Sequence, residues 1–266
     1  MGRVLDIRNQ IAMQIRILGC SGGIGGNLRT TSMLLDNDVL VDAGTGVGDL
    51  TISELLKIDH VFLTHSHLDH ITSLPFLVDT VGPMREAPIT VYCSEPTRKT
   101  LQEHIFNWKV WPDFTEIPNK SSPCMRYSTF SVGDCVDLGG RKINILPANH
   151  VVPAVGFHFD SGEAGLVFTG DTTMNDALWV EVNKIANLRY LIIETAFPNM
   201  EKGLAIASKH LCPSMLAEEL SKLQRSTRVF VTHLKPGAGT LTMQEVEECA
   251  ERYNPRMLSN GQVFKF

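Results

Sequence analysis

The chain has 266 residues, of which 43% are hydrophobic and 20% charged, so it contains enough apolar side chains to bury a large core. Its formal net charge of -5 argues against a protein that binds bulk nucleic acid. No stretch approaches the roughly 18 to 20 consecutive apolar residues of a membrane span, and the N-terminus lacks a signal peptide's apolar centre. We therefore expect a cytoplasmic protein with one domain over residues 1–266, in which residues 1–12 form a leader.

The predicted elements alternate between strands and helices along the chain. Apolar and alternating runs predict strands at residues 13–18, 32–35, 39–42, 60–63, 89–92, 142–146, 155–160, 165–169, 190–194, 229–232 and 262–266. Helices are predicted at residues 69–81, 96–107, 176–186, 213–223 and 243–253. The helix from Pro213 has the clearest pattern, because proline suits a first turn and Met215, Leu216, Leu220 and Leu223 share one face.

Three histidines and an aspartate directly follow the apolar run 61–63: His65, His67, Asp69 and His70. His65 and His67 are two residues apart, so on an extended chain they point to the same side and can bind one ion. Asp69 and His70 are adjacent and, at the start of a helix, lie about 100° apart, which lets them reach a second ion. Such a density of ligands in six residues predicts a metal site rather than an ordinary surface turn.

The pattern H-x-H-x-D-H after an apolar strand resembles the signature of the metallo-β-lactamase superfamily. Members of that superfamily complete a two-metal site with a later His, Asp and His, each after an apolar run, and here these are His150, Asp171 and His233. The resemblance implies an α/β (α+β) fold, the four-layer αββα sandwich. It also implies that one ion is held by His65, His67 and His150 and the other by Asp69, His70 and His233, with Asp171 bridging.

Imidazole and carboxylate ligands without thiolate favour two zinc ions, and leave manganese or iron open. Two adjacent dications lower the pKa of a shared water from about 15.7 towards 7, which supplies a bridging hydroxide at neutral pH. In the same comparison Asp42 is a structural carboxylate rather than a ligand. The glycines at residues 19–26 predict a tight turn beside the site, because no Gly-Lys-Ser/Thr follows to make a phosphate loop. The six cysteines lack C-x-x-C pairing and predict reduced structural thiols.

Glu194 ends an apolar strand, and His210 stands just before a predicted helix. This pair resembles the phosphodiesterase branch of the superfamily, in which the histidine lies over the substrate phosphate. His210, with one ring nitrogen held by Glu194, would act as a general acid or as a cationic phosphate clamp. The alternative is a helix-capping histidine and a buried strand-end acid.

Within that branch, residues 65–75, 107–114, 194–199, 210–213 and 232–237 resemble the class II 3′,5′-cyclic-nucleotide phosphodiesterases. One departure is Cys212, where threonine is more usual. The resemblance implies hydrolysis of 3′,5′-cyclic AMP, or also cyclic GMP, to the 5′-nucleotide. Asp69 or Asp171 would orient the nucleophile, and His210 would protonate the departing oxygen.

Four residues are candidates for contact with this small substrate. Trp111 and Phe114 lie in an aromatic-rich loop and would stack on a purine, unless they pack in the core beneath that loop. Asn199 lies in the Glu194 stretch, and Lys235 follows His233 by two residues, where it would either touch phosphate or remain solvated.

The runner-up function is a nuclease resembling the enzymes that trim transfer-RNA 3′ ends, which share the seven ligands and the Glu and His pair. Against it, no arm rich in glycine and lysine interrupts the chain, and the net charge is unfavourable for a polyanion. A lactone or carbon-ester hydrolase and a non-catalytic binding module are further alternatives. Related enzymes often pair, so a homodimer is an open alternative to a monomer.

Overall fold

The computed structural model describes residues 12–266, so nearly all of the predicted leader lies outside the described residues. Two seven-stranded sheets dominate the described part. The first has the order β16 (Val263–Lys265), β1 (Gln14–Gly19), β2 (Ser32–Leu35), β3 (Val39–Ala43), β4 (His60–Phe62), β5 (Ile89–Ser94) and β8 (Met125–Phe130). The second has the order β15 (Arg256–Met257), β14 (Arg228–Thr232), β13 (Leu188–Glu194), β12 (Gly165–Phe168), β11 (Val155–Asp160), β10 (Arg141–Pro147) and β9 (Cys135–Leu138). A small hairpin joins β6 (Pro118–Asn119) to β7 (Ser122–Pro123).

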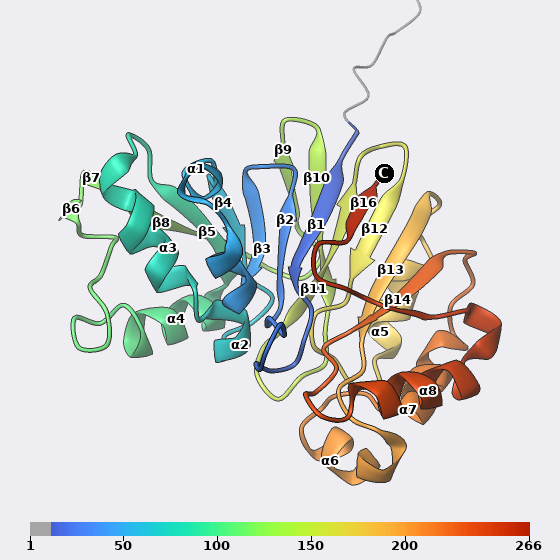
Figure 1. Cartoon of the computed structure of the whole chain (residues 1–266). Coiled ribbons are helices and arrows are strands. Elements are labelled where there is room, and N and C mark those ends of the chain that lie inside the picture. Colours follow the sequence, from blue (N-terminus) through green and yellow to red (C-terminus); the bar gives the residue numbers. More distant parts are fainter. Residues whose placement is uncertain (1–11) are drawn as a thin grey trace, which may run out of the picture.

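Helices cover the outer face of each sheet (Figure 1). The first sheet carries α1 (Ile52–Leu55), α2 (Leu68–Ile71), α3 (Leu74–Val81) and α4 (Glu95–His104), and the second carries α5 (Asp176–Val182), α6 (Lys202–Ala207), α7 (Pro213–Leu220) and α8 (Gly239–Cys249). Short 3₁₀ turns occupy Thr45–Asp49, Gly82–Met84, Asn199–Glu201 and Glu251–Tyr253. No helix within residues 12–266 has both the length and the apolar character needed to cross a membrane.

Three separate apolar clusters hold these layers together. The central cluster lies between the two sheets, where the rings of Phe62 and Phe157 meet edge to face at 5.9 Å. Each outer cluster packs one sheet against its own helices, with Leu77 and Val78 of α3 on one side and Leu216 and Leu220 of α7 on the other. The predicted αββα sandwich is therefore confirmed.

The predicted helix over residues 69–81 is wrong as a single element, because the structure divides it into α2 and α3. Pro75 explains the break: inside a continuous helix it would lack an amide hydrogen and clash with the carbonyl of Ile71, where α2 ends. The amide of Ser73 instead donates to the carbonyl of Ala43 at 2.8 Å, which ties the junction between α2 and α3 to the end of β3.

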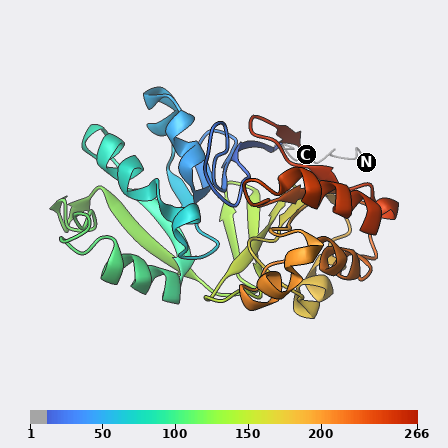
Figure 2. The same cartoon turned by 60° about the horizontal axis from the view of Figure 1, so that its bottom comes forward.

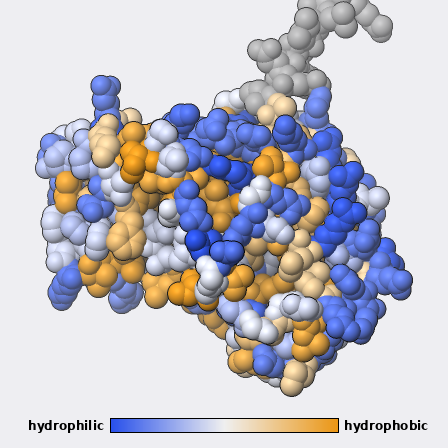
Figure 3. Space-filling model, viewed as in Figure 1, coloured by the Kyte–Doolittle hydropathy of each residue, from blue (hydrophilic) through white to orange (hydrophobic). Residues whose placement is uncertain are grey.

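Strands β8 and β9 were not predicted, and both lie at the edge of a sheet. In β8 only the end residues Met125 and Phe130 are buried, so that strand has no clean apolar alternation. In β9 Val136 and Leu138 alternate with exposed residues, but four residues are too few to give a strong signal. On the face shown in Figure 3, hydrophilic residues cover the region over β14, α7 and α8, and apolar residues are scattered over the rest.

The parallel strands place the candidate site residues at one edge of the sandwich. Strands β3, β4 and β5 run parallel in the first sheet, and β12, β13 and β14 run parallel in the second. The carboxyl ends of parallel strands meet at the same edge, where loops can bring side chains together. That edge is at the bottom of Figure 1, beside α2, and it comes forward in Figure 2.

Candidate metal centre and active site

The first group of candidate ligands comprises His65, His67, His150 and Asp171, whose ligand atoms all lie within 4.8 Å of one another. Nε2 of His150 lies 3.1 Å from Nδ1 of His67. Nε2 of His65 lies 3.7 Å from Oδ2 of Asp171. The loops after β4, β10 and β12 therefore bring residues from both sheets into one cluster.

The second group comprises Asp69, His70 and His233, again with ligand atoms within 4.8 Å of one another. Asp171 stands between the two groups. Its Oδ2 atom lies 3.3 Å from Nε2 of His70, and its Oδ1 atom lies 3.4 Å from Nδ1 of His233. This placement is what a bridging carboxylate requires, and the assignment of individual ligands stays a prediction.

Three buried ring nitrogens in the cluster have no hydrogen-bond partner: Nε2 of His65, Nε2 of His70 and Nδ1 of His233. Buried polar atoms are normally paired, so such orphans indicate a missing partner. Burial holds the pKa of His65 well below its usual range and lowers the pKa of His150 to about 4 and that of His233 to about 3. The imidazoles of His65, His150 and His233 are therefore neutral at pH 7 and offer lone pairs, which suits divalent cations. For His70, burial is outweighed by the carboxylates of Asp171 and Asp42, which raise its pKa.

Asp42 is fully buried beside the cluster and contacts His70. Its carboxylate accepts from Nδ1 of His70 at 2.7 Å and from the amide and hydroxyl of Thr64, each at 2.8 Å. The hydroxyl of Thr64 also lies 3.0 Å from Nδ1 of His65. Asp42 thus orients His70 directly and His65 through Thr64, the arrangement by which outer residues fix metal-ligating imidazoles. Its predicted structural role fits this geometry, whereas Thr64 was missed although it directly precedes the histidine motif.

Two glycines permit the close approach of loops to the cluster. A side chain at Gly22 would meet the carbonyl oxygen of His233 at 2.6 Å, and one at Gly44 would meet the carbonyl oxygen of Asp69 at 2.5 Å. Gly22 lies in the glycine-rich segment 19–26, so that segment does turn tightly beside the site, as the sequence predicts.

His210 and Glu194 form a buried pair at the end of β13 and the start of α7. Nδ1 of His210 lies 2.8 Å from Oε1 of Glu194, whose two oxygens also accept from the amides of Thr172 and Leu211. Burial disfavours the imidazolium, but the Glu194 carboxylate outweighs it and raises the pKa of His210. The ring of His210 is centred 4.9 Å from that of His150 and 5.1 Å from that of His233, so it adjoins both ligand groups.

The aromatic candidates for substrate contact differ in position. Phe114 is only 3% exposed and packs against Phe106 in the outer core of the first sheet, so the expectation that it stacks on a substrate is wrong. Trp111 is partly buried against the same core and meets the exposed ring of Phe76 edge to face at 5.3 Å. Of the two alternatives that the sequence left open, substrate contact and core packing, Phe114 follows the second. Trp111 is only partly buried, so its contact with a substrate stays a prediction.

Lys235 lies at the site, and Asn199 has a structural partner. Nζ of Lys235 donates to the carbonyl of Gly22 at 2.9 Å and lies 3.5 Å from Nε2 of His233. The side-chain oxygen of Asn199 instead accepts from the amide of Ser214 at 2.9 Å, in the first turn of α7. Asn199 thus supplies the cap that Cys212, whose thiol makes no capping bond, does not.

We therefore expect Asn199→Ala to lower the free energy of unfolding by about 1 kcal/mol, because an amide in the first turn of α7 loses its acceptor. KM for substrate should not change. Chemical denaturation and steady-state kinetics on the same preparation measure both quantities. A raised KM at unchanged stability would instead support the prediction that Asn199 contacts the substrate.

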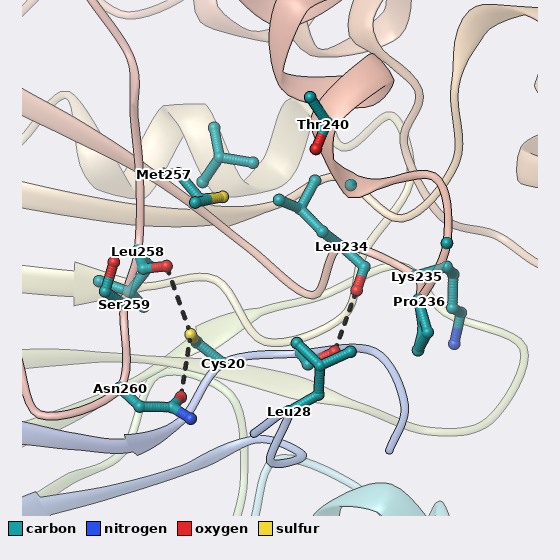
Figure 4. Close-up of a pocket in the computed structure, with 14 residues that line it drawn as sticks. Cys20, Leu28, Leu234, Lys235, Pro236, Thr240, Met257, Leu258, Ser259 and Asn260 are labelled. Carbon is teal, nitrogen blue, oxygen red and sulfur yellow. Dashed lines mark hydrogen bonds between the residues drawn. The ribbon is translucent and has the colours of Figure 1, made fainter. Parts of the chain in front are cut away.

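A cavity of about 430 Å³ adjoins the site behind the loop that carries His233. Figure 4 shows the side chains of Leu28, Leu234 and Met257 around it, with the thiol of Cys20 donating to the carbonyl of Leu258 and to Oδ1 of Asn260, each at 3.4 Å. Burial raises the pKa of Cys20 to about 12, so this thiol is unreactive at neutral pH. All six cysteines are free thiols, as predicted, and none is in either ligand group.

A family model described as the beta-lactamase superfamily domain matches residues 37–256. The chain belongs to this family. Among similar proteins, a probable 3′,5′-cyclic-nucleotide phosphodiesterase of Yersinia pestis is 26% identical over 85% of this chain and 79% of its own length. A ribonuclease Z of Clostridium beijerinckii is 32% identical, over 55% of this chain and 49% of its own length. The fold is shared with unliganded yeast PDE1, which matches 95% of this chain and 99% of its own with a TM-score of 0.78 at 19% identity.

The superfamily resemblance is thereby confirmed, and the His and Asp cluster of this β-lactamase superfamily domain is suited to divalent metals.

Asp69 offers the most direct test of the second ligand group, because its side chain is partly exposed and its loss disturbs the core least. We expect Asp69→Ala to reduce metal content by about one ion per chain, since one of three ligands of that group is removed. Inductively coupled plasma mass spectrometry measures the content, with the exposed Asp79→Ala as the matched control. Unchanged stoichiometry would remove Asp69 from the ligand set.

Proposed function

We propose that the protein is a two-metal phosphodiesterase that hydrolyses 3′,5′-cyclic AMP, and cyclic GMP as a second substrate, to the 5′-nucleotide. The observation that carries the phosphodiesterase part of the proposal is the hydrogen bond between His210 and Glu194 beside both ligand groups. The similarity to the Yersinia pestis protein over 85% of the chain favours a cyclic nucleotide as the substrate. Opening a phosphodiester needs a proton for a poor alkoxide leaving group, and a hydrolase of carbon esters or lactones has less need of that donor.

The chain's own residues divide the task as follows. His65, His67, His150 and Asp171 would hold one divalent ion, and Asp69, His70 and His233 the other, with Asp171 between them. When bound, such ions activate water at neutral pH and neutralise charge on the phosphate oxygens. Glu194 occupies Nδ1 of His210, so Nε2 is the nitrogen that remains free to give a proton to the 3′-oxygen. Lys235 stands next to His233 and would add positive charge on the phosphate side.

A cavity of about 540 Å³ includes His150 in its wall and would receive the nucleoside part. Its size lies within the range of about 300 to 1,000 Å³ that small-ligand sites occupy. Apolar side chains from the loop after His150 and from the end of β8 would contact a base, and polar groups of the α4 N-terminus would contact its edge: Phe130, Val151, Val152, Pro153, Ser94 and Glu95.

A transfer-RNA 3′ endonuclease is the second candidate, and the match to ribonuclease Z favours it. The test is a parallel assay of zinc- and manganese-loaded protein against cyclic AMP, cyclic GMP, a transfer-RNA precursor and a homoserine lactone. We expect turnover of a cyclic nucleotide to exceed that of the other substrates in kcat/KM by at least about 100-fold, roughly 3 kcal/mol of transition-state preference. Preferential cleavage of the RNA, or of the lactone, would overturn the proposal.

A further inference from the structure

Lys209, which directly precedes His210, has an unusual backbone. Its φ of 54° lies in the left-handed region, which side chains other than glycine rarely adopt. Its amide donates to the carbonyl of Ile206 at 3.2 Å, at the end of α6, and the amide of His210 donates to the carbonyl of Ala205 at 2.8 Å. The chain therefore reverses at Lys209, and this turn aims the Lys209 carbonyl away from α6.

That carbonyl accepts from Nδ1 of His150 at 3.1 Å. The bond places the proton of the neutral His150 ring on Nδ1 and leaves Nε2 free, which faces His67 at 3.1 Å in the first ligand group. Lys209 is thus the outer partner of a candidate metal ligand that stands 59 residues earlier in the sequence.

The side-chain ammonium of Lys209 also contacts the loop that carries His150. Nζ donates to the side-chain oxygen of Asn149 and to the carbonyl of His150, each at 3.2 Å. Asn149 is itself held, because its amide nitrogen Nδ2 donates to the carbonyl of Met174 at 2.9 Å and its backbone amide donates to Thr172 at 3.0 Å. The backbone carbonyl and the side-chain ammonium of Lys209 are therefore both hydrogen-bonded to the segment that carries His150.

We propose that Lys209 is a positioning residue that holds the metal ligand His150 and the proton donor His210 in one fixed relation. The two histidines reach the site on different loops. Lys209 is covalently next to His210, and it makes two hydrogen bonds with His150 and a third with the neighbouring Asn149. The part that concerns His210 rests on the proposed function, whereas the part that concerns His150 rests only on the ligand cluster. Loss of the ammonium should consequently loosen both histidines together.

The test compares Lys209→Met, which keeps the length of the side chain and removes the ammonium, with Lys209→Arg, which keeps a cationic donor. Lys202→Met is the matched control, since Lys202 is exposed in the same lobe at the start of α6. One readout is the rate at which EDTA removes zinc from the loaded protein, which reports on His150 without any substrate. The other is the separation of kcat from KM on 3′,5′-cyclic AMP, whose 3′-alkoxide leaves poorly without a proton, so that kcat reports on His210.

We expect Lys209→Met to accelerate zinc release and to lower kcat, each by about 10-fold, with KM unchanged, because outer partners of ligands have effects of about 10- to 100-fold. Lys209→Arg should restore most of both values, and Lys202→Met should change neither. A change in only one readout, or in melting temperature alone, overturns the proposal. If the wild-type protein cleaves no phosphodiester, the proposed function fails, and the ring NMR shifts of His210 then replace kcat as the second readout.

Discussion

Replacement of His210 by alanine is expected to lower kcat by about 10² to 10⁴, the contribution typical of a general acid or base. The two ions should remain bound. The reason lies in the geometry: Nδ1 of His210 is bonded to Glu194 at 2.8 Å, so only Nε2 is left for the site, and His210 belongs to neither of the two proposed ligand groups. Turnover of cyclic AMP and metal content by mass spectrometry, measured on the same sample, are the two required quantities.

The metal measurement is essential because His210 lies near enough to Asp171 and His233 for all three to hold an ion. Loss of metal together with turnover would make His210 a ligand, and retention of both would leave it without a role in catalysis. His104→Ala is the matched control, since that histidine is 70% exposed on α4. Glu194→Gln should show a smaller loss than His210→Ala, because the imidazole keeps its place but loses the carboxylate that favours its charged form.

Replacement of Asp171 by alanine is expected to remove both ions and to abolish measurable turnover, a loss beyond the 10- to 100-fold that an outer residue contributes. Among the described ion-pair contacts, Asp171 is the one carboxylate that lies within 4 Å of all three of His65, His70 and His233. Its removal therefore withdraws negative charge from both groups at once. Metal content and activity across a zinc titration measure the effect.

The exposed Asp176→Ala, at the start of α5, is the matched control for this experiment. Circular dichroism should show that both variants stay folded, since the three apolar clusters do not include Asp171. Retention of one ion at full affinity in Asp171→Ala would show that this carboxylate belongs to a single metal and does not bridge.

Local patterns in the sequence were sufficient for most elements and for four of the seven candidate ligands. His65, His67, Asp69 and His70 lie within six residues behind a strand, so backbone geometry alone brings them to one place. Strands that are buried on both faces, such as β3 and β12, appear as continuous apolar runs and were predicted almost to the residue. Edge strands β8 and β9 were not found, because the four central residues of β8 are at least partly solvated and do not alternate, and β9 is only four residues long. Pro75 could have revealed the break between α2 and α3, since its effect is local.

Resemblance supplied the distant members of the site, His150, Asp171 and His233, but their contacts depend on how the strands are ordered in the two sheets. Three further contacts join residues that are far apart in the chain. They are the packing of Phe114 in the outer core, the cap that Asn199 gives to α7, and the hydrogen bond between Lys209 and His150. The sequence by itself determined which residue types follow which strands, because side-chain period and turn chemistry act over a few residues. Only the tertiary structure decided which of these side chains meet. Such contacts arise from the pairing of strands and the packing of layers, and the pattern of a short segment does not reveal them.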